Sequence, residues 1–241
     1  MPSNQGGDRR PAARKRASAA PTRSAFRGGA PAQERELRSQ GRKTMQRLLD
    51  AGRYVFERRG FHVARVDDIV KVAKTSHGTF YLYFANKEDL FKALAVDAMT
   101  EMEELGNQLP PITPDVDGQA LLREWVTKFV DTYARHGNVI RAWTEGEFAD
   151  KELGTRARDL LIRLSGLLAA RIAEAGHLDG QAEIAGVACL SMLERFNYFQ
   201  QAHQVQFSRD ESIDALTRAV FEGFFMPDKL RRGRRRPTRR S

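Results

Sequence analysis

The sequence predicts an all-α protein, in which a small three-helix head precedes a larger helical domain. Apolar residues recur at spacings of three and four from residue 45 to residue 225, which is the pattern of helices that bury one face. Breaks rich in glycine and proline separate these segments, and the clearest of them spans residues 106–118. No segment alternates apolar and polar residues between turn pairs, so no sheet is expected.

Positive charge is concentrated at the two ends of the chain. Residues 1–33 carry +6 and residues 227–241 carry +7, so the net charge of +9 leaves −4 for residues 34–226. Both ends are rich in arginine and poor in large apolar residues, and we expect both to be disordered. Each end either adds contacts to nucleic acid or is a solvated extension, and a transit peptide is a further alternative for the first.

The part between these ends is itself polarised. Residues 38–91 carry +5, so the acidic excess lies further along the chain. A basic head on an acidic body orients a protein on DNA through its overall field.

Composition argues against several classes of protein. A single cysteine, Cys189, leaves no disulfide framework and fits a reducing cytoplasm, where we expect the protein to act. No apolar run approaches the roughly 18 residues of a membrane helix. The five histidines are scattered without an i, i+4 pair or a nearby cysteine pair, so we expect no metal site, no cofactor and no enzymatic activity.

The first helix is expected from about Arg38 to Arg59. Its apolar stripe is typical of a core-facing helix, and Gly60 follows in the position favoured for a left-handed C-terminal residue. Arg42, at the start of the helix, is placed to touch phosphate.

The stretch from Val66 to Lys87 predicts two short helices joined by a tight turn, followed by the start of another helix. The first runs from Val66 to Ala73, and Ser76 caps the second, which ends near Phe84. The outward face of the second helix carries small groups and then hydroxylated aromatics, where a solubilising face would carry Glu and Lys. Small groups let a helix end press against DNA, and phenol hydroxyls donate to phosphate. The predicted DNA-binding residues are Arg42, Ser76, His77, Gly78, Thr79, Tyr81, Tyr83 and Lys87.

Asn86 and Asp89 form a variant of the capping box at the start of the next helix. Lys87 then occupies the first helical position, where a cation is unfavourable beside the positive end of the helix dipole. An external anion that meets both Lys87 and the free amides would explain its presence.

Residues from about 42 to 91 resemble the N-terminal DNA-binding domain of TetR-type transcriptional repressors. The resemblance rests on the helix ending at Gly60-Phe61, on Asp68-Ile69, and above all on the run from Gly78 to Phe84 followed by Asn86-Lys87-Glu88. It implies that His77, Gly78 and Thr79 approach bases, whereas Tyr81, Tyr83 and Lys87 hold phosphates.

Three residues depart from the family pattern. Arg65 stands where the family usually has a Ser or Thr cap, Lys74 replaces the usual turn glycine, and Thr75 replaces an aliphatic residue. A lysine is strained in such a turn if it adopts positive φ.

Six further helices are expected from residue 86 onward. The fourth helix runs from Asn86 to about Leu105 and joins the head to the body. Then come a helix over residues 121–133 that stops near His136-Gly137, a short one over 139–148, and a long one over 153–175 ended by Gly176. Two more follow over residues 181–204 and 210–225.

Aromatic residues concentrate in the middle of the body, where they either line an apolar cavity or form an ordinary core. The TetR resemblance implies an effector site here. The predicted ligand-binding residues are Met102, Trp125, Phe129, Tyr133, Trp143, Phe148 and Phe196, and the polar candidates are Arg141, Glu145, Glu147 and Arg195. Cys189 lies among apolar neighbours, as an inert buried thiol does.

The last two helices carry more apolar surface than one core face needs. Ala185, Gly186 and Ala188 would let another helix approach closely, which suggests a two-fold interface between copies of the chain. TetR-like repressors usually dimerise through their last two helices. The predicted interface residues are Ile184, Ala188, Phe199, Val220 and Phe224.

Together these features predict four parts: a basic arm over 1–33, a helix-turn-helix domain over 34–91, a ligand-binding and dimerisation domain over 92–226, and a basic tail over 227–241. We expect a TetR-like repressor that binds double-stranded operator DNA as a homodimer, responds to a small apolar or amphipathic effector, and has no membrane partner. The alternatives are a non-switching architectural DNA-binding protein and a cytoplasmic lipid- or acyl-thioester-binding protein.

Overall fold

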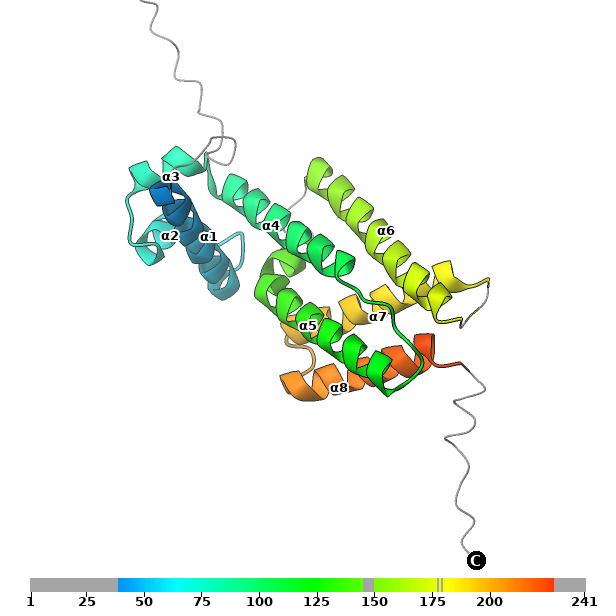
Figure 1. Cartoon of the computed structure of the whole chain (residues 1–241). Helices are drawn as coiled ribbons and strands as arrows, with labels where there is room; N and C mark the ends of the chain where they lie inside the picture. Colours follow the sequence, from blue (N-terminus) through cyan, green and yellow to red (C-terminus); the bar gives the residue numbers. More distant parts are fainter. Residues whose placement is uncertain (1–38, 145–149, 177, 179, 228–241) are drawn as a thin grey trace, which may run out of the picture.

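The structure is a computed structural model that describes residues 39–144, 150–176, 178 and 180–227. Over these residues the chain forms helices and no strand, which confirms the all-α class. None of the described helices is both long and apolar enough to cross a membrane. The elements, drawn in Figure 1, are α1 (Ser39–Arg59), α2 (Val66–Val72), α3 (His77–Tyr83), α4 (Lys87–Asn107), α5 (Val116–Thr144), α6 (Lys151–Glu174), α7 (Ala182–Gln201), α8 (Arg209–Val220) and the π-helical turn η2 (Phe221–Phe225).

Helices α1–α3 form the head, and their local signals lie where the sequence places them. Gly60 ends α1 with a φ of +74°, and the side chain of Ser76 accepts a hydrogen bond from the Thr79 amide at the start of α3. Lys74, in the turn between α2 and α3, has a φ of +51°. A non-glycine residue in this left-handed region is strained, so the turn contains the backbone strain expected for a lysine at this position.

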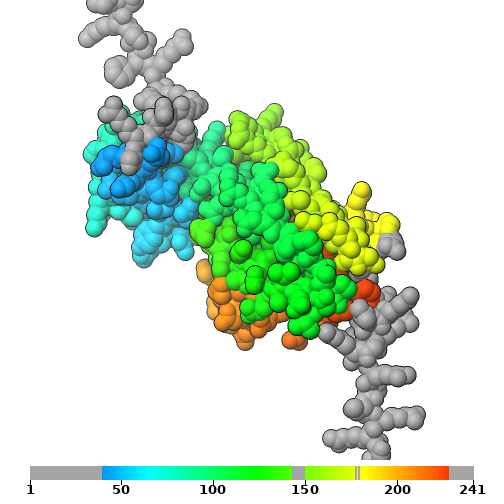
Figure 2. Space-filling model, viewed as in Figure 1, coloured from blue at the N-terminus to red at the C-terminus, as the bar shows by residue number. Residues whose placement is uncertain are grey.

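The head has its own hydrophobic core, which also takes in residues from the body. Phe80 of α3 and Phe84, the residue that follows this helix, are buried, as is Phe91 near the start of α4. Val139 of α5 and Leu153 of α6 belong to the same buried cluster. The head is therefore packed against the body, and Figure 2 shows the two surfaces meeting without an intervening linker.

Helix α4 runs through both cores. Asn86 caps it by accepting from the Asp89 amide at 2.7 Å, as expected. Its first half lies in the core of the head, and its second half, with Met102 and Leu105, lies in the core of the body. Met99 packs against both cores. The boundary expected at residue 91 therefore falls inside one continuous helix.

The sequence prediction was wrong at His136-Gly137, because α5 continues through both residues to Thr144. Glycine in a helix interior costs roughly 0.5–1 kcal/mol relative to alanine and does not by itself end a helix. Here the glycine is needed for packing: a Cβ at Gly137 would lie 2.5 Å from Cγ of Gln201 on α7.

Helices α6 and α7 pack closely along their length. A Cβ at Gly186 of α7 would lie 2.4 Å from the carbonyl oxygen of Ser165 on α6. Gly186 is buried in this contact, and its neighbour Ala185 is buried in the core of the body. Of the small residues expected to face another copy of the chain, only Ala188 is exposed. Gly176, with a φ of +67°, follows α6 as predicted.

Helix α8 begins with a reciprocal capping box. The side chain of Ser208 accepts from the Glu211 amide at 3.2 Å, and the Ser208 amide donates to the Glu211 carboxylate at 3.0 Å. The helix packs against α5, held also by Arg209, which donates to both oxygens of Asp131 at 2.7 Å. In the turn η2, Phe221 and Phe225 are wholly buried in the core of the body.

Candidate DNA-binding surface and effector cavity

Helix α3 is pinned to the head by one face and leaves the other face free. Phe80 is wholly buried, whereas Tyr81 is 57% exposed. Of the other predicted DNA-binding residues, Ser76, His77 and Gly78 are exposed and Thr79 and Tyr83 are half-buried. The structure thus brings these six residues onto one helix and its cap, at the end of the head away from the body (Figure 1). Arg42 is exposed near the start of α1.

Gly78 has no structural reason to be glycine within this chain. The nearest atom to a Cβ built at this position is Oγ of Ser76, at 3.7 Å, which is ordinary van der Waals contact. Its backbone is helical, so no left-handed conformation requires glycine either. A glycine in the first turn of an exposed helix lowers stability, and Gly78 stands among the exposed residues at the start of α3, where the lack of a side chain lets another molecule approach the backbone.

His77 is held in place by an acidic neighbour from the preceding helix. Its Nε2 lies 2.5 Å from an oxygen of Asp67 on α2. Both side chains are exposed, at 54% and 72%. This contact joins the first residue of α3 to α2 and limits the directions in which the imidazole can point.

Lys87 has a partner within the chain, which the sequence argument did not anticipate. Its ammonium group donates to the carbonyl oxygens of Phe61, His62 and Ala64 at 2.9, 3.0 and 3.1 Å. Nζ also lies 4.9 Å from the centre of the Phe61 ring. These carbonyls provide the negative charge that was expected from an external anion, and the lysine ties the segment after α1 to the start of α4. Contact between Lys87 and phosphate stays a prediction and requires this group to leave its carbonyls.

The body contains a cavity of about 580 Å³ between α4, α5, α6 and α7. Three predicted ligand-binding residues line it, namely Met102, Phe129 and Tyr133. A volume of this order lies within the range of small-molecule sites. The remaining lining consists of Ile140, Ala157, Arg158, Leu160, Leu161, Ile162, Leu164, Ser165, Val187, Leu190, Ser191, Glu194 and Arg195.

The polar groups of the cavity come from α5, α6 and α7. Tyr133 donates a hydrogen bond to the Glu194 carboxylate at 3.2 Å. Burial, together with this carboxylate, raises the pKa of Tyr133 far above its ordinary value, so the phenol stays protonated. The Arg195 guanidinium lies 4.7 Å from the centre of the Tyr198 ring. An apolar cavity with one acid and two arginines at its wall suits a molecule with an apolar body and a charged or polar end.

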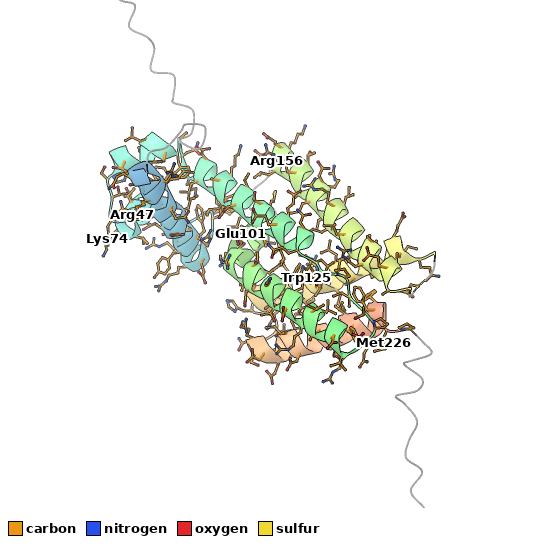
Figure 3. All side chains as sticks on the ribbon, viewed as in Figure 1. Arg47, Lys74, Glu101, Trp125, Arg156 and Met226 are labelled. Carbon is orange, nitrogen blue, oxygen red and sulfur yellow. The ribbon has the colours of Figure 1, made fainter. Side chains whose placement is uncertain are left out.

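Other predicted ligand-binding residues lie elsewhere. Trp125, labelled in Figure 3, is buried in the core and donates its indole N–H to the Leu105 carbonyl at 2.9 Å. It borders a void of about 10 Å³, which is too small for an effector. Phe196 stacks on Phe207 with the ring centres 6.1 Å apart and does not line the cavity. Phe148, Glu145 and Glu147 lie outside the described residues, as does the side chain of Trp143.

Sequence reasoning missed the contribution of α6 to the cavity. Leu160, Leu161 and Leu164 were interpreted only as part of the apolar stripe of a long helix. The signal lay in the width of that stripe, since Leu161 is 48% exposed and Ile162 is 62% exposed in the folded chain. These two residues form the outer wall of the cavity.

The predicted interface residues separate into outer and inner groups. On α7, Ile184 is 74% exposed and Phe199 is 38% exposed, while Val187, beside Ala188, is 55% exposed. These residues leave apolar surface exposed along α7, and Val187 also lines the cavity. Val220 was wrongly expected there, because it is wholly buried in the core of the body, and Phe224 is half-buried against that core.

The head is a helix-turn-helix domain, with α2 and α3 as its two helices and α3 as the exposed one. Residues 48–94 match the family model described as bacterial regulatory proteins, tetR family. Residues 48–94 are therefore similar to the DNA-binding domain of TetR-family helix-turn-helix regulators, which confirms the resemblance seen in the sequence.

Known proteins resemble the chain in sequence and in fold. YdgC of Bacillus subtilis, an uncharacterized HTH-type transcriptional regulator, is 40% identical over 102 residues, which are 39% of this chain and 51% of YdgC. The chain spans about half or less of the length of the curated relatives it matches first.

Solved structures share the fold of the whole described chain. The fatty acid degradation regulator FadR from Bacillus halodurans aligns with a TM-score of 0.60 and 19% identity, over 78% of this chain and 98% of that one. FadR from Bacillus subtilis, solved in complex with stearoyl-CoA, aligns with a TM-score of 0.51 and 22% identity, over 74% and 98%. At these identities the likeness concerns the fold.

The hydrogen bonds of Lys87 make a prediction about stability. Replacing Lys87 by methionine keeps the stem but leaves three carbonyl oxygens without their charged donor, so the free energy of unfolding should fall by about 1–3 kcal/mol. Urea unfolding followed by circular dichroism measures this change. Lys71→Met, on the exposed side of α2, is the matched control and should stay within about 0.5 kcal/mol. If Lys87→Met is as stable as the control while DNA binding loses about one unit of salt slope, Lys87 serves phosphate and not the fold.

Proposed function

We propose that this chain is a transcriptional repressor that binds operator DNA as a homodimer and releases it when an amphipathic small molecule enters the cavity of the body. The observation that carries the DNA-binding half is Gly78, a surface glycine that packing and backbone conformation within the chain leave unexplained. The observation behind the effector half is the cavity of about 580 Å³.

In the proposed complex, the N-terminal end of α3 enters the major groove. His77, Gly78 and Thr79 approach base edges, and Tyr81, Tyr83 and Arg42 contact phosphates. Asp67 positions the His77 ring through their 2.5 Å contact, so it influences base preference without touching DNA. Lys87 reaches phosphate only by exchanging its three carbonyl partners for it.

The dimer is proposed to form through the outer face of α7. Ile184, Val187 and Phe199 leave apolar surface exposed along this helix, and Ala188 allows close approach between two copies. A two-fold axis through this face would present two copies of α3 to one side of a duplex. Half-sites should then lie about 34–36 Å apart, or a multiple of that distance.

The effector is proposed to be a molecule with a long apolar part and an anionic or polar end, such as an acyl thioester. The apolar lining suits the chain, and Arg158 and Arg195 supply positive charge at the wall. The stearoyl-CoA bound by FadR of Bacillus subtilis, which shares this fold, supports the same class.

Two helices would carry the signal from the cavity to the head. Met102 of α4 lines the cavity, and the other end of α4 is buried in the core of the head. Ile140 of α5 also lines it, while its neighbour Val139 packs into the core of the head. A ligand that pushes α4 and α5 apart from α6 would change the tilt of both heads and move the recognition helices out of register with successive grooves.

Gly78→Ala tests the DNA-binding half by separating stability from function. Alanine fits the space at this position, so the free energy of unfolding of the variant should exceed that of the wild type by up to about 1 kcal/mol. The added methyl group should obstruct approach to the groove and weaken binding by about tenfold or more, equivalent to about 1.4 kcal/mol. Fluorescence anisotropy on a genomic fragment selected by the protein measures the affinity.

Gly166→Ala, the same change on the exposed side of α6, should stabilise the protein without altering DNA affinity. Undiminished DNA affinity in Gly78→Ala would contradict the proposed contact between α3 and the groove.

Deleting residues 1–33 and 227–241 distinguishes a repressor from an architectural protein, because only the repressor keeps sequence-specific binding. A lipid carrier would select no DNA fragment in the first place.

Ile184→Glu tests the dimer. A charge on each copy at an apolar interface is destabilising, so the variant should sediment as a single chain at concentrations where the wild type is dimeric. Val116→Glu is the matched control, because Val116 is 69% exposed but lies at the start of α5. A wild type that sediments as a monomer, or an Ile184→Glu variant that stays dimeric, would contradict the interface.

Ala157→Phe tests the cavity. Ala157 is buried on α6 and lines the cavity, so a phenyl group there should occupy part of its volume. We expect calorimetric binding of stearoyl-CoA to be lost while DNA binding persists without release. Ala170→Phe, exposed on the same helix, should behave like the wild type. If Ala157→Phe melts as the control does and still binds stearoyl-CoA normally, the cavity is not the site.

A further inference from the structure

Polar side chains meet where α1, α4 and α5 come together, at the junction of head and body. Asp97 and Glu101 lie one turn apart on α4, and His136 faces them from α5; Glu101 is labelled in Figure 3. One carboxylate oxygen of each acid and one ring nitrogen of the histidine all lie within 4.8 Å of one another. The proposed function makes no use of this cluster.

His136 is the unusual member of the group. Its side chain is wholly buried, and neither ring nitrogen makes a hydrogen bond of normal geometry. Nε2 nevertheless lies only 3.2 Å from an oxygen of Glu101. Leaving a buried polar group unsatisfied costs about 1–3 kcal/mol, and a cation held by this nitrogen and the nearby carboxylates would remove that cost.

We propose that Asp97, Glu101 and His136 form a binding site for a divalent transition-metal ion, with Zn²⁺ as the reference ion. One imidazole nitrogen and two carboxylate oxygens are a ligand set that Zn²⁺ accepts, with a water molecule as the fourth ligand. The nitrogen ligand favours Zn²⁺ and its neighbours in the transition series over Mg²⁺ and Ca²⁺, which prefer oxygen. The carboxylates are 40% and 32% exposed, which gives the ion a path from solvent.

The chemistry of the imidazole suits this role. Burial holds the pKa of His136 below its ordinary value, against the opposing effect of the Glu101 carboxylate. Metal binding requires the neutral imidazole, which keeps a lone pair on one ring nitrogen. A cation between this nitrogen and the two carboxylates would be a shared partner for all three groups.

Two guanidinium groups balance the carboxylates when no metal ion is bound. Arg53 of α1 lies 3.2 Å from Asp97, and Arg135 forms an ion pair with Glu101. Each guanidinium can leave its carboxylate, because Arg53 also contacts Asp50 at 3.3 Å and Arg135 is half exposed to solvent. Metal binding thus exchanges two monovalent cations for one divalent ion, which lowers the affinity relative to a preformed site.

The exchange has a mechanical consequence. The pair between Arg53 and Asp97 joins the head to α4, whereas a bound ion joins α4 to α5 through His136. The metal ion would therefore loosen one connection of the head and tighten the connection between α4 and α5, two of the helices that line the cavity. An effect on DNA affinity rests on the proposed function, but metal binding does not.

The experiment uses the full chain without an affinity tag. Titration with Zn²⁺ is followed by calorimetry, and titration with Co²⁺ by the visible d–d absorption of a low-symmetry site. We expect one ion per chain, with affinity reduced by at least about tenfold in Asp97→Asn, Glu101→Gln and His136→Gln. Because burial raises the pKa of Cys189 to about 12, its thiol does not compete for the ion.

His77→Gln is the matched control, since His77 and Asp67 form another imidazole–carboxylate pair at 2.5 Å and lie on the exposed head. It should leave the stoichiometry and the Co²⁺ spectrum unchanged. The absence of saturable binding at millimolar Zn²⁺ and Co²⁺, undiminished binding in Glu101→Gln, or loss of binding in His77→Gln would overturn the site. Should His136→Gln fold poorly, the two partly exposed carboxylate variants decide the matter. A protein that binds the ion in this way but selects no DNA fragment would refute the repressor and leave the metal site standing.

Discussion

Helix α4 is buried in two hydrophobic cores, and the relation between head and body depends on this double burial. Leu90, Phe91 and Leu94 have no exposed surface in the core of the head, and Leu105 is buried in the core of the body. Protein interiors are close-packed, so a displacement at one end of such a helix is transmitted and not absorbed. Helix α5 has the same property, because Val139 lies in the core of the head and Phe129 in the core of the body.

The head separates the residues that hold it together from those available to a partner. Phe80 and Phe84 fix α3 in place from within, and Lys87, the first residue of α4, holds the segment after α1 through three backbone carbonyls and the Phe61 ring. Because these contacts use buried faces and main-chain atoms, the outward face of α3 is free to vary without loss of the fold. That division explains why a glycine at position 78 and a strained lysine at position 74 are both tolerated in so small a domain.

The junction and the cavity share their walls. His136 and Tyr133 lie one turn apart on α5, with His136 directed at the acids of α4 and Tyr133 at Glu194 of α7. One helix therefore connects the polar group beside the head with the polar group inside the cavity. An ion at the first position and an effector at the second would both act on the same rigid element, which is the physical requirement for coupling between them.

Local features were predictable from the sequence because they depend on atoms a few residues apart. The caps at Ser76 and Asn86 and the left-handed glycine at position 60 are set by hydrogen bonds within one helical turn. The same reasoning failed at Gly137, where a distant side chain, Gln201, and not the local backbone, accounts for the glycine. It failed again at Val220, since helical periodicity shows that a residue is apolar but not which neighbour covers it.

The sequence by itself determined the helical class, the boundaries of most helices and the identity of the recognition segment, all of which follow from periodicity and capping. Only the tertiary structure decided that Lys87 meets carbonyls of the residues around Phe61, that α6 walls the cavity, and that His136 meets Asp97 and Glu101. The contacts of Lys87 and His136 join residues between 23 and 39 positions apart, and their geometry depends on how whole helices cross. The crossing of helices is set by the summed packing of both cores, and no short stretch of sequence contains that sum.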